Sequence, residues 1–186
     1  MEYNLPNELV KELNFGENAK NRIMIGVNKL ASAVKSTLGA SGKCVIYEDG
    51  RGKPVITKDG VTVAQSVVLL DPVENIGATL IKEAASKTVK EAGDGTTTAT
   101  VLAESLLQEI YEILQTQNTR EVKQGIDSAV AKVIEYLESI KIDVDDDMLD
   151  HVATISCNND KELGSIISEA YKTVGKDGVV LMEESD

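Results

Sequence analysis

A glycine-rich stretch followed by hydroxyl residues contains the residue types best suited to chemistry in this sequence. From Ala92 to Glu104 it reads Ala-Gly-Asp-Gly-Thr-Thr-Thr-Ala-Thr-Val-Leu-Ala-Glu. Glycines lack a Cβ, so the backbone can adopt positive φ and bring its amide groups close to a ligand. Between the two glycines lies Asp94, a hard carboxylate of the kind that Mg²⁺ binds together with phosphate oxygens. The stretch therefore fits a cradle for phosphate and metal.

Three consecutive threonines, Thr96, Thr97 and Thr98, stand where a helical pattern begins. Hydroxyl groups, free backbone N–H groups and the positive end of a helix dipole can converge there on an anion. A simpler interpretation is a glycine turn followed by a threonine cap, because Asp, Gly and Thr are all favoured at such positions. Composition alone slightly favours the simpler interpretation, although it explains one threonine and not three in a row.

Two further turns contain residue types that suit the same chemistry. In Lys58-Asp59-Gly60, the lysine can neutralise phosphate charge, and the aspartate can orient a water molecule or help to hold a cation. The turn Thr37–Ala40 ends a helical pattern, with Gly39 as the expected C-terminal cap, and its N–H groups can also face a phosphate. Both patterns are also common in ordinary turns, so neither indicates a site by itself.

Helices are the main elements expected to position these turns. Apolar residues recur at spacings of three and four, which predicts helices over residues 17–38, 72–91, 98–115, 120–140, 148–156 and 161–174. Ile76 and Leu80 mark the expected apolar face of the helix at 72–91, and Leu102 and Leu106 mark that of the helix at 98–115. Short strands are expected at 44–48 and 54–57, joined as a hairpin by a glycine turn, and at 179–182.

The composition argues against several classes of function. Of the 186 residues, 42% are hydrophobic and 27% are charged, which is ordinary for a soluble globular protein. The net charge of −12 argues against nucleic-acid binding and against anionic membrane surfaces. No apolar run approaches the length of a membrane span, and no secretory signal pattern opens the sequence. We therefore expect a cytoplasmic protein that binds neither nucleic acid nor membrane.

Small aliphatic residues must build the core, because only 3% of the residues are aromatic. Cys44 and Cys157 lie far apart and have no CxxC partner, so we expect both to be reduced and buried. The acidic run 143–147 breaks the helical pattern. It lacks the glycine and the final glutamate of a calcium loop, so a solvated linker is expected there. We place a domain boundary near residue 141.

Taken together, these motifs resemble the N-terminal portion of a group I chaperonin, the GroEL-type folding machine. The string Gly-Asp-Gly-Thr-Thr-Thr-Ala-Thr-Val-Leu-Ala is highly specific, and it occurs in family order with the Lys58-Asp59-Gly60 turn. This overturns the preference for the simpler interpretation of the threonines. The resemblance covers the chain from Asn14 to its end. It is carried by residues 37–39, 56–61, 83–87, 92–104, 125–127, 154–156 and 174–179.

The resemblance implies a mainly α fold. Residues 1–140 would form the N-terminal segment of a GroEL-like, multihelical equatorial domain, which binds ATP and includes a small β-hairpin. Residues 141–186 would form a short α/β segment of the intermediate domain that leads to the apical boundary. One departure concerns the turn after the first helix, where the family has proline and this chain has Ala40. Alanine has a backbone N–H that proline lacks, but it does not fix φ as the proline ring does.

The resemblance also implies the site residues. Asp94 matches the aspartate that binds Mg²⁺, and Asp59 matches an aspartate that positions the hydrolytic water. A potassium ion is expected between Thr37, Lys58 and Thr97. The positions that match ATP-binding residues are Thr37, Leu38, Gly39, Ala40, Lys58, Asp94, Gly95, Thr96, Thr97 and Thr98.

The function implied is that of a subunit of an ATP-dependent folding chaperone, in which ATP binding and hydrolysis move domains in a homo-oligomeric ring. Unfolded polypeptides would bind through an apical domain outside this sequence, and a co-chaperonin lid would close the ring. The returning segment with the catalytic aspartate is also outside it, so we expect this chain alone to lack ATPase activity. Without the family's C-terminal segment, helix faces such as Val101, Leu102 and Leu106 should be incompletely covered, so we expect the chain to self-associate. The alternative is a truncated, non-catalytic interaction protein that joins or modulates a full-length chaperonin. A stand-alone phosphotransferase is disfavoured, because the P-loop signature is missing.

Overall fold

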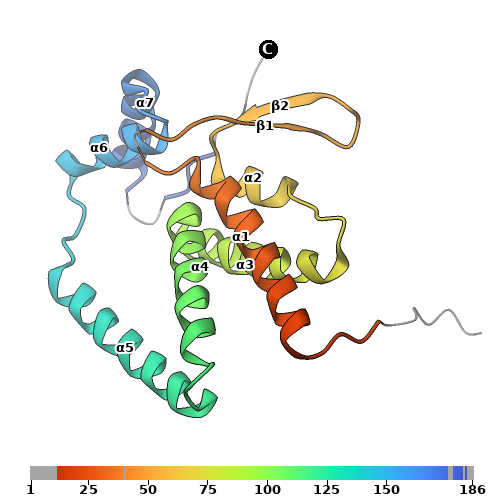
Figure 1. Ribbon diagram of the computed structural model, residues 1–186. Helices are drawn as coiled ribbons and strands as arrows, with labels where there is room; N and C mark the ends of the chain where they lie inside the picture. The colour runs from red at the N-terminus through yellow and green to blue at the C-terminus, as the bar shows by residue number, and fades with distance from the viewer. Residues whose placement is uncertain (1–11, 40, 176–177, 182, 184–186) are drawn as a thin grey trace, which may run out of the picture. The chain divides into compact units, whose positions relative to one another are not determined.

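Helices make up most of the chain in the computed structural model, which describes residues 12–39, 41–175, 178–181 and 183 (Figure 1). The expected mainly α fold with one small hairpin is confirmed for these residues. The chain divides into two compact units, with the boundary between residues 124 and 125. The elements are α1 (Gly16–Lys35), β1 (Val45–Glu48), β2 (Pro54–Thr57), α2 (Gly60–Ser66), α3 (Pro72–Ala92), α4 (Thr96–Ile113), α5 (Thr119–Ile140), α6 (Asp146–Ser156) and α7 (Lys161–Val174).

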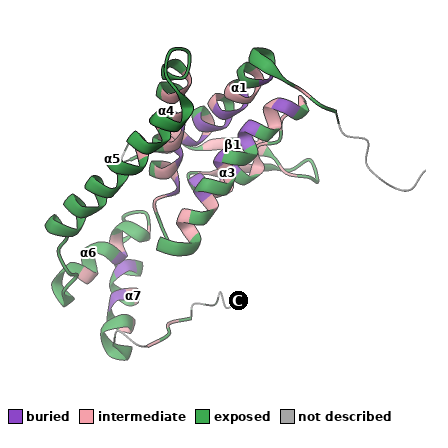
Figure 2. Cartoon of the chain, turned by 90° about the horizontal axis from the view of Figure 1, so that it is seen from below, coloured by how far each residue is buried: buried purple, intermediate pink, exposed green. Residues whose placement is uncertain are grey.

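The core of the first unit lies between α1, α2 and α3 and consists of small aliphatic residues, as the composition predicts. Its buried members are Val27, Leu30, Val34, Val63, Ala64, Ala78 and Ile81. Helices α1 and α3 touch backbone to backbone. A Cβ on Gly26 would lie 1.8 Å from the Glu74 carbonyl oxygen, and one on Gly77 would lie 2.1 Å from that of Ile23. Figure 2 shows buried residues along both helices.

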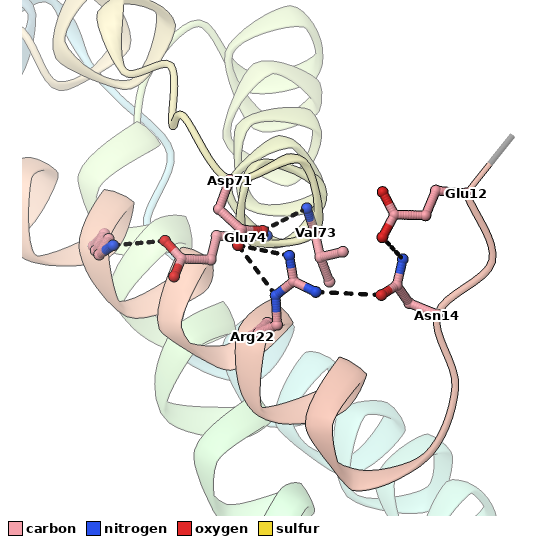
Figure 3. A network of polar contacts seen from close by, with 7 residues as sticks. Glu12, Asn14, Arg22, Asp71, Val73 and Glu74 are labelled. Atoms are coloured by element: carbon pink, nitrogen blue, oxygen red, sulfur yellow. Dashed lines mark hydrogen bonds and ion pairs between the residues drawn. The ribbon is translucent and has the colours of Figure 1, made fainter. Parts of the chain in front are cut away.

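A polar network at the start of α3 fixes the same pair of helices (Figure 3). Arg22 Nη2 of α1 lies 2.6 Å from Asp71 Oδ2. The other carboxylate oxygen caps α3 by accepting the N–H groups of Val73 at 2.8 Å and Glu74 at 3.0 Å. The hydrogen bond from the Glu74 N–H and the guanidinium of Arg22 hold the pKa of Asp71 below its usual range. The cap and the ion pair therefore both need the ionised carboxylate.

The hairpin of β1 and β2 connects α1 to α2. Strands β1 and β2 pair antiparallel from Val45 with Thr57 to Glu48 with Pro54. The turn between them is closed by Asp49, whose Oδ1 accepts the N–H groups of Arg51 at 2.8 Å and Lys53 at 2.9 Å. Residues 58–60 follow β2 directly. The hairpin thus sets where the Lys58-Asp59-Gly60 turn begins.

In several places the structure differs from the sequence-based expectations. Helix α2 was not expected, α1 ends at Lys35 rather than residue 38, and α4 begins at Thr96 rather than Thr98. The expected apolar face of α3 is wrong. Ile76 and Leu80 are exposed, and α3 instead buries Val73, Gly77, Ala78, Ile81 and Ala85. In α4, Leu102 and Leu106 are exposed, as expected for a face left incompletely covered, and the buried residues are Thr96, Thr100 and Glu104.

Cys44 is exposed and Cys157 is half-buried, so the expectation that both are buried is wrong. Both thiols are free. Cys44 immediately precedes β1 in a two-stranded sheet, and such a small sheet cannot enclose the residues at its ends.

In the second unit, α6 and α7 pack closely at Gly164, where a Cβ would lie 2.7 Å from Thr154 Cα. Buried Ser168 donates a hydrogen bond to Asp150, which also pairs with Lys172 at 2.9 Å. The strand expected at 179–182 is not formed by residues 179–181, which have no strand partner, and Met182 lies outside the described residues. Helix α5 has no buried residue.

In the described part of the chain, we find no helix that is both long enough and apolar enough to cross a membrane.

Candidate functional site

Three segments that are distant in sequence meet at Gly60, the first residue of α2. The hydroxyl oxygens of Thr37, just after α1, and Thr97, in the first turn of α4, lie 3.4 Å apart. A Cβ on Gly60 would lie 2.4 Å from the Thr97 hydroxyl oxygen and 3.5 Å from that of Thr37. Only glycine leaves room for this arrangement, so the structure brings together parts of all three turns that the sequence singles out.

The two hydroxyl groups keep lone pairs for a ligand. Thr37 Oγ1 donates to the carbonyl oxygen of Val34 at 2.8 Å, so Thr97 is the donor within the hydroxyl pair. At 3.4 Å that contact is longer than an ordinary O–H···O hydrogen bond. Both residues are half-buried. The pair therefore presents two oxygen atoms that can accept a hydrogen bond or coordinate a cation.

The turn after α1 continues with Leu38 and Gly39, which are both exposed. Gly39 has a φ of +71°, and its carbonyl oxygen accepts the N–H of Gly42 at 2.9 Å. It therefore supports the loop after the helix rather than the helix end itself, where Ser36 is the cap. Ala40, the position at which the family has proline, lies outside the described residues.

Asp59 caps α2 with both of its carboxylate oxygens. Oδ1 accepts the N–H of Val61 at 3.2 Å, and Oδ2 accepts the N–H of Thr62 at 2.9 Å and its hydroxyl group. Partial burial raises the pKa of Asp59, but these hydrogen bonds outweigh it and hold the pKa below the usual value. The carboxylate is thus ionised and oriented. Lys58, beside it, is exposed.

The other end of α2 is held by α3. Lys82 Nζ donates to the carbonyl oxygens of Val67 and Gln65, at the C-terminal end of the helix, where cations are favoured. Burial lowers the pKa of this lysine. Although α2 spans only Gly60–Ser66, it is therefore fixed at both ends, which fixes Asp59 and Gly60 in turn.

Two glycines in the left-handed conformation shape the loop between α3 and α4. Gly93 has a φ of +75° and ends α3, and Gly95 has a φ of +89° and begins α4. The exposed carboxylate of Asp94 accepts the N–H of Gly95 at 2.6 Å. Helix α4 has no side-chain cap, whereas α2, α3, α6 and α7 are each capped by an aspartate. The first N–H groups of α4 are therefore left for a ligand or water.

Thr96 and Thr98 differ from Thr97 in their surroundings. Thr96 is buried and Thr98 is exposed, and the carbonyl oxygen of Thr96 accepts the hydroxyl of Thr100 at 2.9 Å. Among the three threonines, Thr97 is thus the one whose hydroxyl meets the turns from the other two segments. Thr96 can reach a ligand at the helix start through its N–H.

The donor set fits Mg²⁺ better than a metal held by the protein alone. Within the described residues, no group of three or more His, Cys, Asp or Glu side chains is close enough to hold a metal ion. Mg²⁺ usually takes one or two carboxylates and completes its shell with phosphate oxygens and water. A single exposed carboxylate at Asp94, beside an uncapped helix start, matches that requirement.

Sequence reasoning missed the roles of Gly60, Lys35 and Glu104. Glu104 is buried and forms an ion pair with Lys35, the last residue of α1. Its other oxygen accepts the side-chain N–H of Gln108 at 3.2 Å. A signal was present, because Thr96, Thr100 and Glu104 recur every four residues, which places them on one helix face. In a sequence, however, a helix face made of polar residues does not indicate burial.

Comparison with known proteins gives a consistent picture. The sequence model of the TCP-1/cpn60 chaperonin family matches residues 30–184. Two crystal forms of the chaperonin gp146 from the bacteriophage EL 2 (Pseudomonas aeruginosa), in the presence of ATP-BeFx, match with a TM-score of 0.74 and 35% sequence identity. Each match covers 85% of this chain and 28% of the gp146 chain, so this chain spans less than a third of these relatives' length. The chain belongs to the TCP-1/cpn60 chaperonin family.

Proposed function

We propose that this chain carries the nucleotide site of an ATP-dependent folding chaperone, at the point where the turns after α1 and β2 meet the start of α4. The observation that carries the proposal is the meeting of Thr37, Gly60 and Thr97. Two hydroxyl oxygens lie 3.4 Å apart, and a glycine stands where a Cβ would come within 2.4 Å of one of them. Small residues and oxygen donors at one point allow the close approach that a phosphate group needs.

The start of α4 supplies the anion-binding part. Its uncapped N–H groups and the positive end of the helix dipole face the phosphates, with Gly95, Thr96, Thr97 and Thr98 providing the backbone. Asp94 would hold Mg²⁺, a cation that usually takes one or two carboxylates. In the turn after α1, Gly39 can offer a further backbone N–H group, whereas the N–H of Leu38 is already bonded to the Lys35 carbonyl oxygen at 3.1 Å. Mg²⁺ held by Asp94 would supply positive charge against the transferred phosphate.

A potassium ion is proposed at the hydroxyl pair. Thr37 and Thr97 contribute oxygen atoms, which are the ligands that such a hard cation prefers. Lys58 can contribute only its backbone carbonyl oxygen, because its ammonium group repels a cation. That ammonium group is exposed and remains available for a phosphate.

Asp59 is the proposed catalytic residue. Because its carboxylate is ionised and fixed by the α2 cap, it repels the charge of bound ATP and can order the attacking water in the transition state. Its loss should therefore affect turnover more than binding. As the resemblance implies, we expect the isolated 186-residue chain to show negligible ATPase activity.

The wider activity is proposed for the natural-length protein. By analogy with the family, ATP binding and hydrolysis would drive domain movements in a homo-oligomeric ring that encloses unfolded polypeptides under a co-chaperonin lid. The relative gp146 was crystallised in the presence of ATP-BeFx, which supports a nucleotide site in this family. A cytoplasmic location remains the expectation from sequence.

A second candidate is a non-catalytic interaction protein that joins or modulates a full-length chaperonin. It is favoured by the apolar residues on the outer side of α4, where Leu102 is 58% and Leu106 is 50% exposed. Such a protein would bind a chaperonin subunit through this face without needing Mg²⁺ or ATP.

Calorimetric titration of ATP into the natural-length protein, with and without Mg²⁺, tests the proposal. Wild type should bind ATP more tightly with Mg²⁺, and Asp94→Asn should lose that Mg²⁺-dependent gain with unchanged helix content. Glu109→Gln, an exposed carboxylate further along α4, serves as a matched control and should retain the gain. A wild type without Mg²⁺-dependent binding would favour the interaction protein.

A further inference from the structure

A buried charge lies next to the candidate site. The side chain of Glu104 is only 6% exposed, while its partner Lys35 is 38% exposed. Removing a carboxylate from water is costly unless it is paired and hydrogen-bonded. Here Lys35 pairs with one oxygen and Gln108 donates to the other at 3.2 Å, so every oxygen has a partner. The arrangement is specific, because no apolar side chain could replace both contacts.

Further polar contacts continue along the same two helices. Gln108 also donates to Asn28 at 3.1 Å, and the Tyr111 hydroxyl lies 2.5 Å from Asn21 and 3.1 Å from Glu17. We call this set of contacts the polar seam; it comprises Glu17, Asn21, Asn28 and Lys35 of α1 and Glu104, Gln108 and Tyr111 of α4. The Lys35–Glu104 pair is its member nearest to the candidate site.

The pair and the hydroxyl contact are successive links between the same two segments. Thr37 follows Lys35 by two residues. Glu104 follows Thr97 by seven residues, which is about two turns, or roughly 10 Å, along the same side of α4. A shift between the end of α1 and α4 must therefore change both contacts. No other ion pair in the described residues joins α1 to α4.

We propose that Glu104 is a positioning residue of the nucleotide site: its ion pair with Lys35 sets the separation of the Thr37 and Thr97 hydroxyl groups. This inference rests on the proposed function. It implies that loss of the pair weakens binding of potassium and of Mg·ATP, because both depend on oxygen and N–H groups held across the α1–α4 contact. The rate at which bound ATP is hydrolysed should change less, because Asp59 is fixed separately by its α2 cap.

A purely structural role predicts a different result. Many ion pairs only add stability, and their loss lowers the melting temperature without altering a ligand site. The Lys29–Glu74 pair provides the matched control, because it joins α1 to α3 at 2.5 Å and its glutamate side chain is 15% exposed. Glu74→Gln should lower stability to a similar degree as Glu104→Gln, with no effect on potassium or ATP binding.

The experiment compares wild type, Glu104→Gln, Glu104→Ala, the charge-swapped Lys35→Glu/Glu104→Lys variant and Glu74→Gln in the natural-length protein. Titration calorimetry gives the Kd for Mg·ATP at several KCl concentrations, and single-turnover assays give the hydrolysis rate. Methyl NMR of the nucleotide-free protein follows the contact between Thr37 and Thr97. We expect Glu104→Ala to raise the Kd about tenfold, Glu104→Gln to raise it less, and the charge swap to recover most of the loss.

The NMR contact between the threonines should weaken in parallel with the loss of affinity. Wild-type Kd and potassium dependence in both Glu104 variants, with a lowered melting temperature like that of Glu74→Gln, would overturn the inference and leave the proposed function intact. If Glu104→Ala does not fold, Glu104→Gln alone decides between these outcomes. Failure of wild type to bind Mg·ATP would instead remove the proposed function, and the NMR comparison would still test whether Glu104 positions the threonines.

Discussion

Helix α1 meets its two long neighbours in different ways. Toward α3 the two backbones touch at Gly26 and Gly77 and leave no space, and two ion pairs, Arg22–Asp71 and Lys29–Glu74, add to this contact. Toward α4 the contact is the polar seam, built from an ion pair and side-chain hydrogen bonds. Both contact faces belong to α1, so the difference between them comes from the residues that lie on each face.

The α1–α3 contact therefore serves as a rigid scaffold, whereas the α1–α4 contact adjoins the candidate site. A backbone contact without space has one geometry, since any shift produces a clash or a cavity. Polar side chains can exchange partners with one another and with water, so the spacing across a polar contact depends on which partners are paired. The candidate nucleotide site lies at the end of the polar seam, where a ligand that binds across it would also tighten it.

The largest expected effect comes from filling the backbone contact between α1 and α3. Gly26→Ala places a Cβ 1.8 Å from a backbone oxygen that cannot move aside cheaply. We expect the free energy of unfolding to fall by about 3 kcal/mol. Gly125→Ala, in the exposed helix α5 with no atom near its added Cβ, is the control and should stabilise the protein by about 0.5–1 kcal/mol. Thermal unfolding measures both, and equal melting temperatures for the two variants would contradict the scaffold role.

Next in size is the effect of Asp59 on turnover. Asp59→Asn keeps a good helix cap but removes the charge, whereas Asp59→Ala loses both. In the natural-length protein, we expect Asp59→Asn to lower kcat about 100-fold while the Kd for ATP and the melting temperature stay near wild type. Asp59→Ala should in addition lose about 1 kcal/mol of stability. Single-turnover assays beside calorimetry separate these effects, and an Asn variant with normal turnover would exclude a catalytic role.

A smaller effect, on self-association, is expected from the outer side of α4, which takes part neither in the α1–α3 contact nor in the candidate site. Leu102 and Leu106 are at least half exposed, and exposed apolar surface favours association. We expect the 186-residue chain to self-associate, and Leu102→Lys/Leu106→Lys to weaken this without lowering the melting temperature. Sedimentation velocity over a range of concentrations measures it. A wild-type chain that stays monomeric throughout would show that these residues are ordinary surface positions.

The smallest expected effect is on the pH dependence of stability. The folded pKa of Asp71 is lowered from 3.8, so its stabilising contribution is present above about pH 4 and is lost as the pH falls through the lower folded value. Asp71→Asn keeps a cap but cannot titrate. Between about pH 5 and pH 3, it should therefore lose less stability than wild type, as measured by denaturant unfolding. Parallel losses in both proteins would mean that the Arg22–Asp71 pair does not stabilise the folded state.

Periodicity predicted the long helices well, because α3, α5 and α7 show regular apolar spacing and clear start signals. It missed α2, whose seven residues are too few to display a helical period and which depends on Asp59 and Lys82 at its ends. The expected face of α3 was wrong because Gly77 and Ala78, which look unremarkable as apolar residues, allow the closest approach. Helix boundaries and buried faces depend on partners that a single sequence does not reveal.

The same limit applies to the candidate site. Motif spacing singled out Thr37, Asp59 and Thr97 in three separate turns, and the structure brings Thr37 and Thr97 together beside Gly60, the residue after Asp59. The role of Gly60 could not be predicted, because it depends on the position of a hydroxyl group from another helix. Glu104 was hidden for the same reason, since its partner Lys35 is 69 residues away in the sequence. The assignment of ligands to each site residue stays a prediction.

The central claim is that three turns form one nucleotide site at Gly60, and calorimetric titration of Mg·ATP into Gly60→Ala tests it most directly. Its added Cβ would lie 2.4 Å from the Thr97 hydroxyl, which can rotate away at little cost to stability but would then leave the site. We predict a Kd raised about tenfold or more in the natural-length protein, with a melting temperature close to wild type. Wild-type affinity in a folded Gly60→Ala protein would contradict the claim, because ATP would then bind without the meeting of these turns.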